Sequence, residues 1–422
     1  MSWTDPVEAF RDVAAGHARM FWLDGGGSRD WSGRRSLIGW LGDEDVSLTY
    51  DAARREVRRH TGADQDVVGD DIFDCLEAEM ARDRGDPSVS WVGYLGYACR
   101  PDLPATPEAG SDVPDAMWMR VRNPLVFDHP AAELSDAGGA IAAQASDSSE
   151  EFDSVRREEY AGWFERVQEQ LRLGNSYEVN LTYRQEVRSR TDPVTAYLRL
   201  RDINPAPYAG FLQHNGVSVL SSSPERFATI DRHRWVETKP IKGTTPRGTT
   251  PEEDERHRET LCTDPRFRAE NLMIVDLLRN DLSMVCEPGT VTVQALMEVE
   301  SYASVHQLVS TVRGHLRPGV STIEALRALF PAGSMTGAPK LRTMGIIADV
   351  ETTPRGVYAG ALGWISGDGR ADLGVVIRTL VGAPAGGRYV LGTGGGITVR
   401  SDAESEYDET RWKAARLFAA LT

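Results

Sequence analysis

Residues 357–397 read VYAGALGWISGDGRADLGVVIRTLVGAPAGGRYVLGTGGGI, and this stretch decides the fold class. Three apolar runs, at 357–365, 371–381 and 388–397, are separated by glycine-rich turns, which indicates three consecutive strands. A helical pattern follows near 402–421. Strands that come in neighbouring runs, with helices between the runs, favour an α+β fold over a doubly wound α/β fold.

The same alternation of strands and helices continues toward the N-terminus. The segments 217–230 and 235–244 read as strands joined by a turn, and residues 251–285 read as strongly helical. Residues 128–154 are rich in Ala, Ser, Gly and Asp, which is typical of a loop. We therefore expect a strand-rich N-terminal part at 1–127, a linker-like segment at 128–154 and a second part at 155–422.

The composition excludes several classes of protein. The chain has 422 residues, with 47 Lys and Arg against 63 Asp and Glu, a net charge of −16. This balance argues against binding to nucleic acid or to an anionic membrane, which requires a dense basic face. No apolar run is long enough to span a bilayer. Asp5, Glu8 and Arg11 stand where a signal peptide needs an apolar run, so we expect none in these first residues. Four cysteines without CxxC spacing indicate buried thiols, so we expect a cytoplasmic protein.

Lysine occurs at only four positions, Lys239, Lys242, Lys340 and Lys413. An ammonium group that is desolvated can lose its proton and attack carbon, whereas a guanidinium group stays charged. Lys242 lies at a strand end in the sequence PIKGT (240–244), followed by Gly243, whose N–H is able to bind a carboxylate, and by Thr244. The alternative is a turn lysine in solvent.

Carboxylates in three places are candidates for acid–base or metal chemistry. Glu225 in SPERF (223–227) is either a surface charge that pairs with Arg226 or a buried acid with a raised pKa. Glu270 lies in an otherwise apolar helical stretch, while Glu406 and Glu409 share one helix face with Lys413. Such carboxylates are able to hold Mg²⁺, although a solvated helix face has the same pattern.

Backbone-rich turns and one cation complete the candidate site. Ser334 lies in a run of small residues before a helix, and Gly394 and Gly395 lie in a second glycine-rich turn, so both turns are able to bind an anion. Arg378 is a lone cation on the VVIRTLV strand, which requires an anionic partner, either a ligand or an internal salt bridge.

Taken together and in this order, the motifs resemble those of the chorismate-utilising enzymes, the family of anthranilate synthase component I. The resemblance is close over about 155–420. It rests on ENLMIVDLLRND (270–281), VHQLVST (305–311), GSMTGAPK (333–340), RGVYAGALGW (355–364), IRTL (377–380) and ESEYDETRWKA (404–414). It implies a large sandwich of two packed, mostly antiparallel sheets with outer helices, and a chorismate-binding catalytic part at 155–422.

The resemblance also implies roles for the candidate residues. Lysine in PIKGT is typical of the aminodeoxychorismate synthase branch, whereas the anthranilate, isochorismate and salicylate synthases typically have Ala there. Lys242 then corresponds to a nucleophile, expected as an uncharged amine, that adds at C2 of chorismate, and Glu225 to the acid that protonates the departing C4 hydroxyl. Glu270 and Glu409 correspond to Mg²⁺ ligands, with Glu406 close by. The positions that correspond to binding of the substrate's carboxylates are Arg378, Tyr358, Ser334, Gly394 and Gly395, with Gly243, Thr244 and Lys413 as further candidates. Lys239 and Lys340 are expected to be structural.

Departures from the sibling enzymes narrow the expected reaction. Gln307 stands where anthranilate synthases have a His linked to pyruvate loss, and Glu178 replaces the Lys with which isochorismate synthases activate water. The tryptophan-feedback signature is missing, and FWLDGG occupies the comparable stretch. The implied activity is formation of 4-amino-4-deoxychorismate for p-aminobenzoate and folate. The alternatives are an anthranilate synthase, a 2-amino-2-deoxyisochorismate synthase, or a chorismate-binding regulatory subunit without catalysis.

The source of ammonia is expected to be a second protein. No cysteine lies in a GxCxG-like elbow of the kind that glutaminases use. The resemblance therefore implies a heterodimer with a glutamine amidotransferase subunit.

Overall fold

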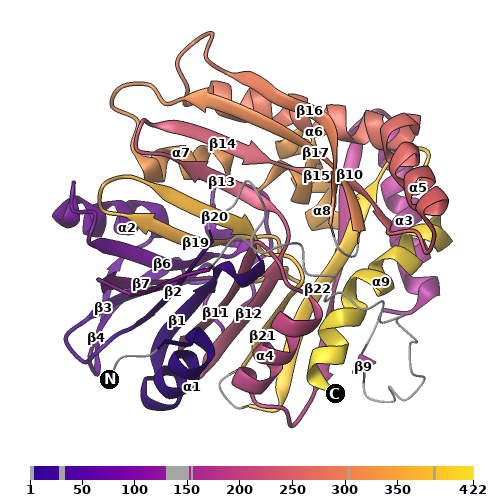
Figure 1. Ribbon diagram of the computed structural model, residues 1–422. Coiled ribbons are helices and arrows are strands. Elements are labelled where there is room, and N and C mark those ends of the chain that lie inside the picture. Colours follow the sequence, from indigo (N-terminus) through magenta and orange to yellow (C-terminus); the bar gives the residue numbers. More distant parts are fainter. Residues whose placement is uncertain (1–3, 28–33, 130–151, 154, 303–304, 384–385) are drawn as a thin grey trace.

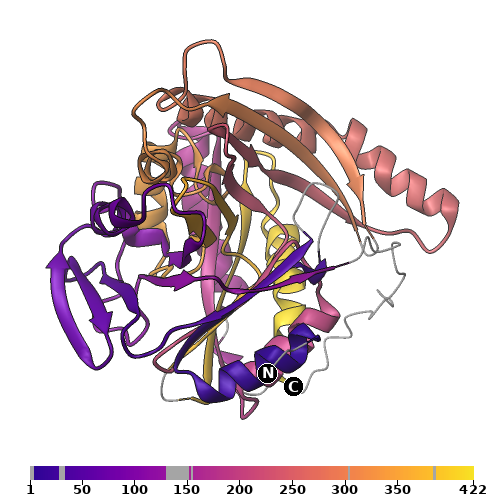
Figure 2. The same ribbon diagram turned by 60° about the vertical axis from the view of Figure 1, so that its left-hand side comes forward.

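The computed structural model describes residues 4–27, 34–129, 152–153, 155–302, 305–383 and 386–422. In this part of the chain, two large sheets pack face to face and helices cover their outer sides (Figures 1 and 2). Every pairing between the described strands is antiparallel. The expected α+β sandwich with outer helices is therefore confirmed.

The first sheet runs in the order β18-β10-β22-β21-β12-β11-β1-β2-β8, and β9 pairs with β10 outside this path. Its strands are β1 (Arg19–Asp24), β2 (Arg35–Trp40), β8 (Leu125–Asp128), β9 (Phe152–Asp153), β10 (Glu178–Arg188), β11 (Tyr208–His214), β12 (Val217–Ser223), β18 (Gly337–Ala338), β21 (Thr379–Gly382) and β22 (Arg388–Ile397).

The second sheet runs in the order β15-β17-β14-β13-β20-β19-β6-β7-β3-β4-β5, and β16 pairs with β17. Its strands are β3 (Val46–Asp51), β4 (Glu56–Thr61), β5 (Asp64–Gly69), β6 (Val89–Leu95), β7 (Ala116–Arg122), β13 (Arg226–Ile230), β14 (Trp235–Lys239), β15 (Ile241–Pro246), β16 (Thr292–Ser301), β17 (Val305–His315), β19 (Ala361–Ser366) and β20 (Ala371–Val375).

The helices divide between the two outer faces. Helices α1, α3, α4, α8 and α9 contact strands of the first sheet, and α2, α5, α6 and α7 lie on the side of the second (Figure 1). Their bounds are α1 (Pro6–Gly16), α2 (Ile72–Met80), α3 (Arg157–Arg172), α4 (Pro193–Ile203), α5 (Pro251–Thr263), α6 (Pro265–Ser283), α7 (Thr322–Leu329), α8 (Lys340–Val350) and α9 (Ala403–Leu421). Single 3₁₀ turns lie at Gly25–Gly27, Ala81–Asp83, Tyr97–Cys99 and Gly333–Met335.

Alternation along the strands builds the separate core layers. On β1, Met20 and Trp22 belong to the cluster formed with α1, α4 and α9, whereas Phe21 belongs to the cluster between the sheets. On β7, Trp118 faces the helices of the second sheet, and Met117 packs between the sheets. Successive side chains of a strand point to opposite faces, so β1 and β7 are buried on both faces.

Two of the points at which the chain crosses from one sheet to the other position the site. Strand β12 of the first sheet ends at Ser223, and β13 of the second begins at Arg226, with Pro224 and Glu225 between them. Strand β20 ends at Val375, and β21 of the other sheet begins at Thr379. The Val375 N–H donates to the Glu225 carbonyl oxygen over 2.9 Å, which ties the two crossings together.

These crossings correct two sequence-based predictions. The segments 217–230 and 371–381 were expected as single strands, but each breaks where the chain changes sheets. Arg378 therefore lies between strands rather than on one. Its φ of 50° belongs to the left-handed region, and its side chain is half-buried.

The other expectations have mixed outcomes. The helical segment 251–285 forms two helices, α5 and α6, because the Asp264 side chain accepts the N–H of Arg266 and caps the second one. The four cysteines are free thiols, but only Cys99 and Cys286 are buried, and the other two are half-buried. The part at 1–127 contributes strands to both sheets, and 128–154 lies mostly outside the described residues. Among the described helices, none combines the length and apolarity needed to cross a bilayer.

Candidate active site

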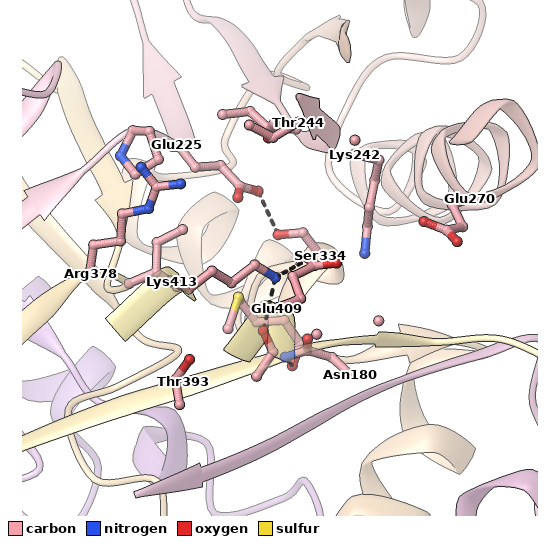
Figure 3. A pocket seen from close by; sticks show the side chains of 18 of the residues that line it. Asn180, Glu225, Lys242, Thr244, Glu270, Ser334, Arg378, Thr393, Glu409 and Lys413 are labelled. Atoms are coloured by element: carbon pink, nitrogen blue, oxygen red, sulfur yellow. Dashed lines mark hydrogen bonds and ion pairs between the residues drawn. The ribbon is translucent and has the colours of Figure 1, made fainter. Parts of the chain in front are cut away.

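A cavity of about 400 Å³ lies at the two crossings, between the ends of the sheets and helices α6 and α9. It brings together all the residues that the sequence singled out as catalytic, substrate-binding or metal-binding. These are Lys242, Glu225, Arg378, Tyr358, Ser334, Thr244, Gly243, Gly394, Gly395, Lys413, Glu270, Glu406 and Glu409. Figure 3 shows Lys242 and Glu270 on one side of the cavity and Arg378 on the other.

Lys242 lies on β15 and is buried at the cavity wall. Its Nζ forms an ion pair with the carboxylate of Glu178, the first residue of β10. Burial alone would lower the pKa of Lys242, but the carboxylates of Glu178, Glu270 and Glu225 outweigh burial and raise it above its ordinary value. The amine expected to be uncharged is therefore an ammonium group in this structure.

Glu225 is 6% exposed and lies in the crossing between the sheets. Its side chain accepts a 2.6 Å hydrogen bond from the Ser334 hydroxyl (Figure 3). Burial raises the pKa of Glu225 to about 7, although Ser334, Lys242 and Lys413 act in the opposite direction. Of the two alternatives for Glu225, the structure has the buried acid, and Arg226 pairs with Glu237 at 2.5 Å. Glu225 is thus a carboxylic acid poised to give up a proton near neutral pH.

Three further carboxylates reach the cavity from two helices. Glu270 comes from α6, and Glu406 and Glu409 come from α9. Burial raises the pKa of Glu270 to about 7, and burial together with the charge of Glu409 raises the pKa of Glu406. Among the described residues, no three acidic, His or Cys side chains form a ready-made metal cluster. The carboxylates fit a hard divalent cation, because their mutual repulsion is relieved when such a cation binds.

Lys413 holds Glu409, one of these three carboxylates, against strand β22. Its Nζ contacts Glu409 at 2.7 Å and donates to the Gly394 carbonyl oxygen over 3.0 Å. The charge of Lys413 lowers the pKa of Glu409. A Cβ added at Gly395 would lie 3.2 Å from the Glu406 carboxylate and 3.8 Å from Lys413 Nζ. The absence of a side chain at this position keeps the end of the cavity open.

The remaining wall offers groups that bind anions. The Tyr358 ring stacks under the Arg184 guanidinium, whose carbon lies 4.7 Å from the ring centroid. Burial raises the pKa of Tyr358 to about 12, so its hydroxyl remains a hydrogen-bond donor. Arg378 faces the same cavity from the second crossing. A cation and a neutral hydroxyl on one wall suit a carboxylate ligand.

The lysines expected to be structural lie elsewhere. Lys239 forms an ion pair with Glu300 at 2.7 Å, and Lys340 forms one with Asp281 at 2.6 Å. Neither of these two lysines lines the cavity. Gln307 does line it, on β17 directly opposite Thr244 of β15.

Several lining residues were missed by the sequence analysis, among them Asn180, Arg266, Thr393, Gly396 and Trp412. Spacing would have found some of them. Arg266 precedes Glu270 by one helical turn, and Asn180 is two residues beyond Glu178 on β10, so each shares a face with its neighbour. Thr393 and Gly396 flank the expected glycine pair on β22.

The chain resembles known proteins over most of its length. The family model described as chorismate binding enzyme matches residues 40–419. An aminodeoxychorismate synthase of Streptomyces pristinaespiralis is 41% identical, and the match covers 99% of this chain but only 64% of that longer relative.

Another relative and a solved structure are also similar to this chain. The anthranilate synthase component 1 1 of Haloarcula marismortui is 44% identical over 80% of this chain and 78% of its own length. The crystal structure of anthranilate synthase component I from Streptococcus pneumoniae superimposes with a TM-score of 0.75 at 26% identity, covering 92% of this chain and 93% of that chain. Family model, relatives and fold agree, and the chain belongs to the chorismate binding enzyme family.

Proposed function

We propose that the chain converts chorismate and ammonia to 4-amino-4-deoxychorismate, the aminodeoxychorismate synthase reaction. One observation carries the proposal: a buried primary amine, Lys242, shares a cavity with Glu225, a carboxylic acid whose pKa is about 7. A nucleophile and a proton donor at opposite ends of one ring system are what an addition with loss of hydroxyl requires.

The reaction then divides into two displacements. Lys242 Nζ bonds to C2 of the ring while the C4–O bond breaks, and Glu225 protonates the hydroxyl so that it leaves as water. Ammonia next bonds to C4, the ring double bonds shift back, and the C2–N bond to Lys242 breaks. One difficult substitution becomes two easier ones, which is the usual gain from covalent catalysis.

Substrate binding is assigned to groups that complement two carboxylates. Arg378, the Tyr358 hydroxyl and the backbone at Gly394 and Gly395 line the cavity wall and are assigned to the substrate's carboxylates. Ser334, Gly243, Thr244 and Lys413 complete the proposed set.

Magnesium is the proposed cofactor, held by Glu270 and Glu409 with Glu406 nearby. The ion would supply positive charge to a substrate carboxylate. We expect Glu409→Gln to raise the Mg²⁺ concentration needed for half-maximal activity by at least about tenfold, because one anionic ligand is lost. A magnesium titration of the rate, together with calorimetric Mg²⁺ binding, measures this. An unchanged titration in Glu409→Gln would contradict the assignment.

A separate glutamine amidotransferase subunit is the proposed source of ammonia, and the product is proposed to feed p-aminobenzoate and folate synthesis. None of the four cysteines lies in a GxCxG-like elbow of the kind that glutaminases use. We therefore expect ammonium salts, but not glutamine, to support turnover by this chain alone.

A second candidate is anthranilate synthase, because a relative of that name is 44% identical. Lys242 and Gln307 disfavour this candidate, because the resemblance implies that anthranilate synthases have Ala and His at these two positions. Mass spectrometry of the product from chorismate, ammonium and Mg²⁺ separates the candidates. We expect 4-amino-4-deoxychorismate without release of pyruvate. Anthranilate with pyruvate, or 2-amino-2-deoxyisochorismate, would replace the proposal, and chorismate binding without turnover would favour a regulatory subunit.

A further inference from the structure

The carboxylate of Glu178 has an unusual environment. Its side chain is 1% exposed, and one of its oxygens contacts Lys242 Nζ. The other oxygen, Oε2, is buried and has no hydrogen-bond partner among the described residues. A buried carboxylate oxygen without a partner is costly, and such groups concentrate where chemistry uses them. Glu178 Oε2 is therefore able to accept a proton or a hydrogen bond next to the proposed nucleophile, Lys242.

The backbone is shaped to admit this ion pair. Strand β22 runs beside β10, and Gly396 is the register partner of Asn180. A Cβ at Gly396 would collide with the Glu178 carboxylate and lie 3.1 Å from Lys242 Nζ. Only a glycine at this position leaves room for both groups.

The ion pair also creates a chemical requirement. An ammonium nitrogen has no free electron pair, so Lys242 must lose a proton before it bonds to carbon. The charged groups that interact with Lys242 are Glu178 from β10, Glu225 from the first crossing, Glu270 from α6 and Glu409 from α9. Glu225 is assigned to the departing hydroxyl and Glu270 and Glu409 to the metal, and Glu178 is the one in direct contact.

We propose that Glu178 is the proton acceptor that converts Lys242 from a resting ammonium into the nucleophilic amine, an inference that rests on the proposed function. The proton moves from Lys242 Nζ to the Glu178 carboxylate, and the free amine then bonds to C2 as water leaves from C4. When ammonia has added to C4, the C2–N bond breaks and Lys242 departs as a neutral amine. It recovers its proton from Glu178, while the ammonium ion that supplied the ammonia restores the proton of Glu225.

The competing explanation is that Glu178 is only a counter-ion that holds Lys242 in place. The two explanations predict opposite effects of Glu178→Gln, which keeps the shape of the side chain but takes up no proton. If Glu178 accepts the proton of Lys242, its replacement slows formation of the bond between Lys242 and C2. If Glu178 is only a counter-ion, its replacement leaves more of Lys242 neutral, and this bond forms equally fast or faster.

The test measures single-turnover formation of the Lys242–substrate bond, with chorismate and Mg²⁺ but without ammonia, by quenched-flow intact-protein mass spectrometry. We expect Glu178→Gln to slow this step by about 10²-fold, the usual contribution of general base catalysis. Glu178→Asp, which keeps a carboxylate, should recover part of the rate. Glu186→Gln is the matched control, since Glu186 lies on the same strand and pairs with Arg388 at the surface. It should react like the parent.

A second readout is independent of turnover. With only four lysines in the chain, ¹³C,¹⁵N-labelled lysine gives few side-chain NMR signals, and Lys242→Arg assigns the relevant one. We expect Lys242 to be an ammonium at neutral pH in the parent and to show a lower pKa in Glu178→Gln. A parent-like or faster bond-forming rate in Glu178→Gln would overturn the proposal. If the parent itself forms no bond at Lys242, the proposed function is wrong. If the parent forms the bond and Glu178→Gln forms it as fast, only the proposed role of Glu178 is wrong.

Discussion

At the scale of single residues, the active-site chemistry depends on two carboxyl groups with different tasks. Glu225 is buried and hydrogen-bonded by a neutral hydroxyl, whereas Glu178 is buried against an ammonium group. Burial raises the pKa of the first to about 7, so it is able to remain protonated near neutral pH, while the second contacts the Lys242 ammonium group directly. Two carboxyl groups in distinct environments thus provide an acid and a base in one cavity.

Ser334→Ala tests the acid assignment through its pH dependence. Glu225 acts in its protonated form, so the rate of bond formation at Lys242 should fall above its pKa of about 7. The Ser334 hydroxyl favours the ionised carboxylate, so its removal should raise the pKa of Glu225 and move the falling limb to higher pH. In Glu225→Gln this limb should disappear and the rate should drop by about 10²-fold or more. A limb that stays in place in Ser334→Ala would refute the assignment.

Sequence reasoning found Lys242 and Glu225 through local motifs but misjudged the charge of the lysine. The amine was expected to be neutral because burial disfavours an ammonium group. The counter-charge comes from Glu178 on β10, 64 positions away and in the other sheet. Local sequence patterns carry no information on such a long-range pairing, although Glu178 stands where the isochorismate synthases have a Lys.

At the scale of elements, the site depends on strands β12 and β20, which end before the strands that the sequence predicts at 217–230 and 371–381. The patterns at 217–230 and 371–381 predict continuous strands, yet Glu225 and Arg378 reach the cavity because each strand breaks there and the chain changes sheets. The apolar run 375–381 continues through the second break, so periodicity alone hides it. The first break instead coincides with the polar run 221–226, which contains Pro224. Helices α6 and α9 were predicted well because their apolar spacing extends over several turns.

Gly396→Ala tests how closely β22 approaches the ion pair. The added methyl group would displace the Glu178 carboxylate and Lys242. Displacements of about 1 Å commonly reduce rates by about 10²-fold, so we expect a loss of this order in bond formation at Lys242. Gly345→Ala, in α8, is the control, because a Cβ there meets nothing within 4 Å. If Gly396→Ala reacted as fast as Gly345→Ala, the prediction that a methyl group at position 396 displaces Glu178 and Lys242 would be wrong.

At the scale of the whole molecule, polar contacts as well as apolar side chains join the two sheets. His214 of β11 accepts or donates a 2.9 Å hydrogen bond with Ser47 of β3, and its ring lies 5.1 Å from that of His60 on β4. Arg19 of β1 donates to the same serine over 3.2 Å. Strands of both sheets meet at this buried group, which was not predicted because its members are scattered between positions 19 and 214.

The stability of the sandwich should reflect this group at acid pH. Burial, His60 and Arg19 lower the pKa of His214 to about 3, against about 6.5 in an unfolded chain. Between these values the unfolded chain binds a proton that the folded chain excludes. The free energy of unfolding therefore decreases, as pH falls below 6.5, by about 1.4 kcal/mol per pH unit from this residue alone.

His214→Gln removes this contribution and retains a hydrogen-bonding side chain. Urea unfolding at pH 6.5 and 4.5 should therefore show a smaller loss of stability in His214→Gln than in the parent. Equal losses in the two proteins would place the acid sensitivity elsewhere.

The most direct test of the central claim is the mass of the protein itself after reaction with chorismate and Mg²⁺ in the absence of ammonia. We predict a covalent adduct on Lys242, located by peptide mapping, that disappears when ammonium is added as 4-amino-4-deoxychorismate is released. Lys242→Ala should form neither the adduct nor this product at an appreciable rate, while still binding chorismate. Product formation by Lys242→Ala at the parental rate, with no adduct on the parent, would contradict the account.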